Sequence, residues 1–193
     1  MSIQAAIADG GIMTKFLKNK LPFSFEEEFG EIRRSMTNYV NNKVQIVDYK
    51  KCDIQFISTL GLSNLNIFNT QKAEWFMEFD GALASENAAS MMDYYVSMLI
   101  EGHIPFPKRG NFILFPDQRD HIWPNDNTCG IYFTLPAYRS EEFDINMEKI
   151  GILTIWVVPI TISDKDIIEN KGWEYLEDYW DNNNTDLHNP FRK

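Results

Sequence analysis

Apolar residues recur at helical spacing in the first part of the chain. Between residues 24 and 40 they form one stripe, which consists of Phe25, Phe29, Ile32, Met36 and Val40. Side chains spaced by three or four residues share one face of a helix, so the pattern predicts a helix over residues 24–40. Ser24 followed by Glu27 is the capping-box pattern expected at the start of that helix.

Two further helices are predicted on the same grounds. One covers residues 85–101 and ends at Gly102. Its buried face consists of Ala88, Met92, Tyr95, Val96 and Leu99. The other starts near Ser163, with Asp166 in its first turn, and its apolar face consists of Ile168, Gly172, Tyr175, Leu176 and Tyr179. A glycine inside a helix costs about 1 kcal/mol relative to alanine. We therefore expect this helix to approach the sheet closely at Gly172.

Short apolar runs between these helices predict strands. They cover residues 44–48, 53–60, 75–79, 111–115, 129–135 and 151–160. The last run, GILTIWVVPI, is apolar almost throughout, which is typical of a central strand covered on both faces. Pro159 has no backbone N–H to donate to a neighbouring strand, so we expect it to end this strand.

The order of these elements predicts the fold class. Helix, strands, helix, strands and helix follow one another, which indicates an α/β (α+β) fold with a mixed sheet and helices packed against it. A chain of 193 residues suits one domain. We expect residues 1–22 to form an N-terminal arm and residues 23–193 to form the domain.

Composition and charge narrow the classes of partner. The formal net charge is -10 and the pI is about 4.7. Nucleic-acid binding needs a surplus of lysine and arginine, and an anionic membrane would repel the chain, so we expect neither partner. A basic protein would be attracted, although acidic residues also serve solubility alone. The first twenty residues lack the pattern of a signal peptide, so we expect a cytoplasmic protein.

The residues able to carry chemistry form no known motif. Cys52 and Cys129 belong to no CxxC motif or Cys/His cluster, and we expect two buried free thiols, although a disulfide stays open. His103 and His121, combined with Cys129, leave a small hydrolase as an alternative. With Asp120, the same histidines leave a metal site open, without the usual ligand spacing. We therefore expect no enzyme, no cofactor and no metal.

Two motifs in sequence order carry a family resemblance. The first is an S-T-x-G-x-S turn at residues 58–63, directly after an alternating strand. The second is the closing segment, in which a strand ending in Val-Pro-Ile at 158–160 precedes KGWEYL at 171–176 and an Asp186 to Arg192 motif. From about residue 40 to its end, the chain resembles the suppressor-of-fused (SUFU) family, including its bacterial members.

The resemblance implies a protein-binding domain that is not an enzyme. The animal relative restrains a transcription factor, and stand-alone bacterial relatives are similar to immunity proteins that neutralise a toxin. The resemblance therefore favours an immunity protein (antitoxin) whose partner is a toxin domain, for example a basic nuclease. The alternative is a regulatory module that restrains an endogenous protein.

The last predicted helix carries the candidate partner-binding residues. Four acids at i, i+3, i+4 and i+7 form one stripe, flanked by two tryptophans: Glu174, Glu177, Asp178 and Asp181, with Trp173 and Trp180. An acidic stripe beside exposed tryptophan would suit a basic partner. The alternative is a solvated outer face with tryptophans in the core. Likewise, the 58–63 turn is either a structural turn that needs Gly61 or a phosphate contact through backbone N–H groups.

Overall fold

The computed structural model describes residues 21–65, 67, 72–80, 85–116, 127–189 and 192, with the side chains of residues 85 and 86 left out. Most of the predicted N-terminal arm lies outside the described residues, as do Asp120 and His121. Leu21 and Pro22, which we assigned to the arm, instead begin the first described helix, where Leu21 is buried.

A mixed sheet forms the centre of the domain and confirms the predicted fold class. The described strands are β1 (Glu31–Thr37), β2 (Gln45–Lys51), β3 (Ile54–Leu60), β4 (Ala73–Asp80), β5 (Phe112–Leu114), β6 (Thr128–Thr134) and β7 (Leu153–Thr161). Their order across the sheet is β1-β2-β3-β4-β7-β6-β5. Strands β4 and β7 are parallel, and the other neighbouring pairs are antiparallel.

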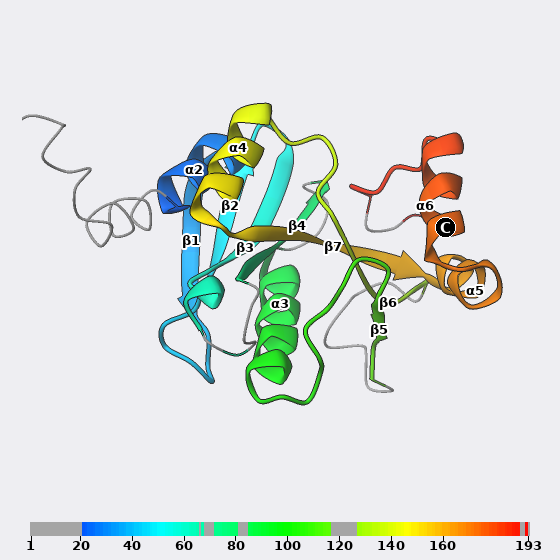
Figure 1. Cartoon of the computed structure of the whole chain (residues 1–193), viewed down its shortest axis with the longest axis horizontal. Helices are drawn as coiled ribbons and strands as arrows, with labels where there is room; N and C mark the ends of the chain where they lie inside the picture. The colour runs from blue at the N-terminus through cyan, green and yellow to red at the C-terminus, as the bar shows by residue number, and fades with distance from the viewer. Residues whose placement is uncertain are drawn as a thin grey trace, which may run out of the picture.

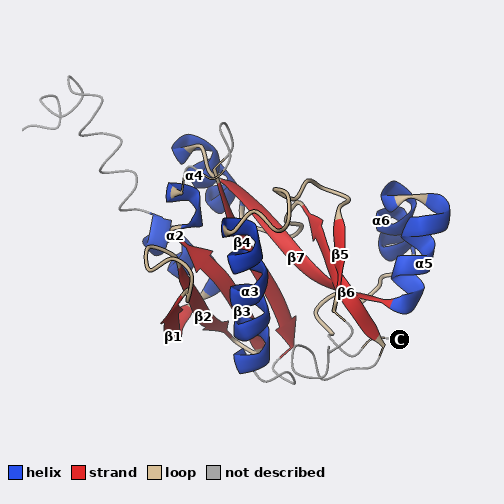
Figure 2. Ribbon diagram, turned by 90° about the horizontal axis from the view of Figure 1, so that it is seen from below, coloured by secondary structure: helices blue, strands red, loops and turns tan. Residues whose placement is uncertain are grey.

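Helices cover both faces of this sheet. They are α2 (Leu21–Phe29), the short 3-10 helix η2 (Leu62–Asn64), α3 (Ser85–Ile100), α4 (Glu141–Ile150), α5 (Ile162–Lys171) and α6 (Trp173–Asn182). Helix α3 packs on one face, and α2 and α4 pack on the other (Figure 1). Helices α5 and α6 lie side by side at the far end of the sheet (Figure 2). Because both faces are covered, the central strand β7 is buried almost throughout, as predicted.

The predicted helix over residues 24–40 is wrong beyond Phe29. Helix α2 ends there, and Gly30 adopts a φ of +91°, after which the chain continues as β1. A Cβ atom at Gly30 would lie 2.3 Å from the carbonyl oxygen of Lys50, so the close passage of β2 requires glycine here. Ile32 and Met36 therefore lie on an edge strand and are 44% and 39% exposed.

The predicted last helix is two helices, because Gly172 interrupts it. Gly172 has φ +89° and ψ 165°, which no helix allows. A Cβ atom there would meet nothing within 4 Å, so the glycine serves the backbone conformation and the expected close approach to the sheet is wrong. Thr161, and not Ser163, caps α5 through a capping box with Asp164. Pro159 lies inside β7, which continues to Thr161.

Helix α4 was not predicted, although the sequence contains its start and stop signals. Ser140 caps the helix by accepting a hydrogen bond from the Phe143 N–H, and Gly151 ends it with a φ of +67°.

The thiols were predicted only in part. Neither cysteine forms a disulfide within the chain, but Cys52 is exposed, contrary to our expectation, because it lies in the turn between β2 and β3. None of the described helices is long and apolar enough to cross a membrane.

Candidate functional site

The S-T-x-G-x-S turn encloses a buried carboxylate. Glu74 on β4 is fully buried, and its carboxylate accepts hydrogen bonds from the hydroxyls of Thr59 and Ser63, each at 2.6 Å. The N–H groups of Gly61 and Ser63 donate to the same side chain at 2.9 and 3.1 Å. Burial raises the pKa of Glu74, and these hydrogen bonds oppose that shift.

This arrangement settles the role of the turn. Gly61 has a φ of +101°, and a Cβ atom there would lie 2.2 Å from the carbonyl oxygen of Lys43. The backbone N–H groups that a phosphate would need already donate to Glu74. The structural interpretation of the motif is therefore confirmed, since the turn requires Gly61 and its donors bind Glu74 of β4.

The closing motif ties the end of the chain to α5 and α6. The Trp180 indole N–H donates to Asp164 at 2.9 Å, and the Arg192 guanidinium donates to the other oxygen of Asp164 at 3.0 Å. Arg192 also donates to the carbonyl of Pro159 at 2.5 Å. Trp180 is only 4% exposed, so it belongs mainly to the core. Trp173 is partly buried and packs over Gly110, beneath the guanidinium of Arg109.

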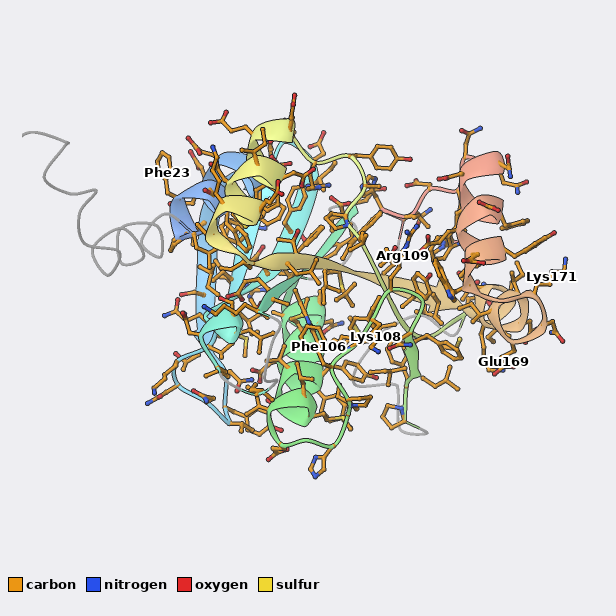
Figure 3. All side chains as sticks on the ribbon, in the orientation of Figure 1. Phe23, Phe106, Lys108, Arg109, Glu169 and Lys171 are labelled. Carbon is orange, nitrogen blue, oxygen red and sulfur yellow. The ribbon has the colours of Figure 1, made fainter. Side chains whose placement is uncertain are left out.

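Glu177, a member of the predicted acidic stripe, is bound by other side chains of the same domain. It accepts hydrogen bonds from Tyr132 and Thr134, each at 2.7 Å, and it forms an ion pair with Arg109. Figure 3 shows Arg109 reaching toward α6 from the loop before β5. Burial raises the pKa of Glu177, but the hydrogen bonds from its partners outweigh burial and lower it. Glu177 is thus ionised and neutralised within the domain.

The other three acids of the stripe, Glu174, Asp178 and Asp181, are exposed on α6. Asp181 also lines a cavity of about 200 Å³, which α6 forms with the segment after it and the loop after β6. The further lining residues are Tyr138, Trp156, Trp180, Asn184, Thr185, Asp186, Leu187 and His188. We call the three exposed acids, Tyr138 and this cavity the C-terminal surface.

Tyr138 is the most exposed large apolar residue of the described chain, at 81%. Its backbone has a φ of +65°, a left-handed conformation that is unfavourable for a bulky residue. An exposed aromatic ring held by a strained backbone beside a cavity is a feature of binding sites. No spacing pattern in the sequence marks Tyr138, because its neighbours in space come from distant segments.

The residue after Tyr138 fixes this loop to the core. The guanidinium of Arg139 lies 2.5 Å from the Glu78 carboxylate and 3.6 Å from the Glu28 carboxylate, and all three side chains are buried. It also lies over the aromatic rings of Phe29, Phe56 and Phe76. The loop that presents Tyr138 is therefore anchored by a buried ionic network.

His188 joins the same network from the C-terminal segment. Its Nε2 lies 3.3 Å from Glu78 Oε1, and its carbonyl accepts a hydrogen bond from the Asp80 N–H at 2.8 Å. The neighbouring Glu78 carboxylate raises the pKa of His188. Two buried carboxylates thus face two basic side chains, Arg139 and His188. The network therefore contacts the cavity through His188, which lines it, and the Tyr138 loop through Arg139.

The residues considered for chemistry are not assembled into a site by the described structure. The His103 side chain is 64% exposed at the end of α3, where it contacts Glu101 at 3.5 Å. Cys129 is half-buried on β6. His121 lies outside the described residues. Among the described residues, no group of three or more His, Cys, Asp or Glu side chains is placed to hold a metal ion.

Comparison with known proteins identifies one family. The family model described as Suppressor of fused protein (SUFU) matches residues 41–193, which is most of the chain. The match begins within the loop before β2 and includes both the 58–63 turn and the closing motif. A comparison with curated proteins finds no significant match.

Proposed function

We propose, from the premise that this chain belongs to the suppressor-of-fused family, that it is a non-catalytic domain that binds and restrains another protein. Its contact is the C-terminal surface. The observation that carries the proposal is the placement of Tyr138, 81% exposed beside a cavity lined by Trp156, Asp181 and Asp186. Tyrosine and tryptophan at a well-packed site contribute disproportionately to protein binding.

The chemistry of this surface favours a basic partner. The cavity has aromatic walls and two carboxylates, so an arginine or lysine side chain would gain both a cation–π contact and an ion pair there. The exposed acids Glu174, Asp178 and Asp181 extend the negative surface along α6. The net charge of -10 would speed association with a positively charged protein.

More narrowly, we propose that the chain is an immunity protein whose partner is a toxin domain with a basic, nuclease-like active site. Such an active site binds phosphate groups, and a row of carboxylates occupies it in place of the substrate. The support is the acidic C-terminal surface together with the family membership. The second candidate, regulation of an endogenous protein, draws support from the edge strand β1, which is exposed along almost its whole length and open to strand addition.

Co-purification of the tagged chain from its own host, with mass spectrometry of what it retains, tests the proposal. We expect one stoichiometric partner with a basic domain, encoded beside this chain if it is a toxin. Recovery of an endogenous regulatory protein would replace the immunity proposal with the second candidate. Failure to retain any protein from the host extract would contradict protein binding.

Charge reversal then tests the contact surface. A triple variant in which lysine replaces Glu174, Asp178 and Asp181 should weaken binding by at least about tenfold. Charge pairs at the rim of an interface raise the rate of association, and charge pairs in its core slow dissociation. The matched control reverses Glu26, Glu27 and Glu31, which are also exposed but lie on α2 and β1. Equal weakening by both triple variants would show that net charge, and not this surface, governs binding.

A further inference from the structure

A groove of about 480 Å³ lies where helix α4 meets the start of β7. The loop after β6, which leads from the sheet to α4, forms a further wall (Figure 1). The lining residues are Leu135, Pro136, Asp144, Met147, Glu148, Gly151, Ile152, Leu153 and Thr154. We call it the α4–β7 groove.

Most of the lining is apolar. Leu135 is 46% exposed, and Ile152 and Leu153 are half-buried, whereas Met147 belongs to the buried core. A Cβ atom at Gly151 would meet nothing within 4 Å, so no side chain closes the groove at this end of α4. Contiguous apolar surface with a polar rim is typical of a protein interaction site.

The spacing of the lining residues along α4 suits a second helix. Asp144, Met147 and Glu148 lie at i, i+3 and i+4, and Gly151 follows at the end of the helix. Side chains at this spacing form a ridge, and the ridges and grooves of two helices pack into one another. An amphipathic helix binds such a groove through apolar residues that recur at the same spacing.

Two carboxylates give the groove a negative rim. Asp144 and Glu148 are exposed and four residues apart on α4, a spacing at which like charges destabilise a helix. No basic residue of the described chain forms an ion pair with either carboxylate, and none lines the groove. A lysine or arginine from a partner would relieve this repulsion, so the rim complements a basic helix.

One loop joins the groove to the C-terminal surface. Leu135 and Pro136 line the groove, and Tyr138, two residues later, belongs to the C-terminal surface. Two residues of extended chain span about 7 Å. A protein bound to the C-terminal surface is therefore within reach of the groove.

We propose that the α4–β7 groove binds an amphipathic helix of the protein that this domain restrains. Apolar side chains of that helix pack against Leu135, Met147 and Ile152. Its lysine or arginine side chains pair with Asp144 and Glu148. This contact rests on the proposed function, and it specifies the kind of segment that the partner presents.

Photo-crosslinking of the full chain to the co-purified partner tests this contact. The crosslinking residue p-benzoylphenylalanine replaces Leu135, which is 46% exposed, and mass spectrometry identifies the attached peptide. We expect a partner peptide that has apolar residues at helical spacing and carries lysine or arginine. The same replacement at Tyr39, which is 68% exposed after β1, is the control and should give no crosslink to that peptide.

The outcomes separate this contact from the proposed function. A crosslink from position 135 to an acidic peptide, to a second copy of this chain or to the chain itself would overturn the helix contact. Absence of any crosslink to a partner that is still retained would also overturn it, and would leave the proposed function standing. Failure to retain any partner would instead contradict the proposed function, and this contact with it.

Two double variants on α4 test the charges. Asp144→Asn combined with Glu148→Gln should weaken partner binding by at least about tenfold. Glu141→Gln combined with Glu142→Gln removes the same charge from exposed positions of the same helix that do not line the groove, and should leave the affinity unchanged. All four side chains are exposed, so we expect both variants to fold. Equal affinities of the two variants for the partner would overturn the proposal.

Discussion

The Arg139 guanidinium lies 2.5 Å from the Glu78 carboxylate in the interior of the domain, where neither side chain is more than 6% exposed. Glu28 shares the same guanidinium at 3.6 Å. These three residues come from α2, β4 and the loop after β6, so one ionic network joins three distant parts of the chain. It also supports the adjacent Tyr138.

Replacement of Arg139 by methionine should lower the free energy of unfolding by about 3–5 kcal/mol, because it leaves two buried carboxylates without their main cation. Urea denaturation measures this change. Arg109→Met is the control, since Arg109 also pairs with a glutamate but is 49% exposed, and it should cost distinctly less. Equal costs for the two variants would show that burial of the network is not what stabilises it.

The pH dependence of stability should report on His188. Its folded-state pKa is raised by Glu78, with Asp186 and Asp80 acting in the same direction. Its contribution is therefore fully present below the unfolded pKa, about 6.5, and is lost as pH rises through the folded pKa. The difference in unfolding free energy between the wild type and His188→Gln should shrink as pH rises from about 6 to about 9. A difference that stays constant over this range would remove His188 from the network.

Two glycines with positive φ provide a matched test of the 58–63 turn. Gly102 has open space around it, whereas a Cβ atom at Gly61 would lie 2.2 Å from a backbone oxygen. Gly102→Ala should cost only the conformational strain, about 1–2 kcal/mol. Gly61→Ala should cost about 1–3 kcal/mol more, because the turn around Glu74 must shift. Thermal or urea unfolding measures both, and similar losses would mean that the turn adapts without strain.

Much of the fold was predictable because local pattern and tertiary structure agree. The buried face of α3 and the doubly covered strand β7 follow directly from their apolar spacing. The errors arose where one backbone angle decided the outcome. The apolar spacing at Ile32 and Met36 fits a helix, but the left-handed Gly30 turns the chain into β1. Gly172 divides the last helix in the same way.

The candidate site was predictable only in part. The acidic residues of α6 were identified from spacing, and three of them are exposed as a binding role requires. Spacing along α6 does not indicate that Tyr132, Thr134 and Arg109 would neutralise Glu177, because these residues lie on other elements. Tyr138 was missed for a related reason, since the partners that anchor its neighbour Arg139 lie on α2 and β4, far away in the sequence.

The affinity of a Tyr138→Ala variant for the co-purified partner tests the role of the C-terminal surface most directly. Tyr138 is 81% exposed, and Tyr39 is a matched control that is 68% exposed and lies after β1. We predict that Tyr138→Ala weakens binding by about 2 kcal/mol or more, as expected of a binding hot spot, while Tyr39→Ala leaves it unchanged. Binding by Tyr138→Ala with wild-type affinity would contradict the proposed contact surface.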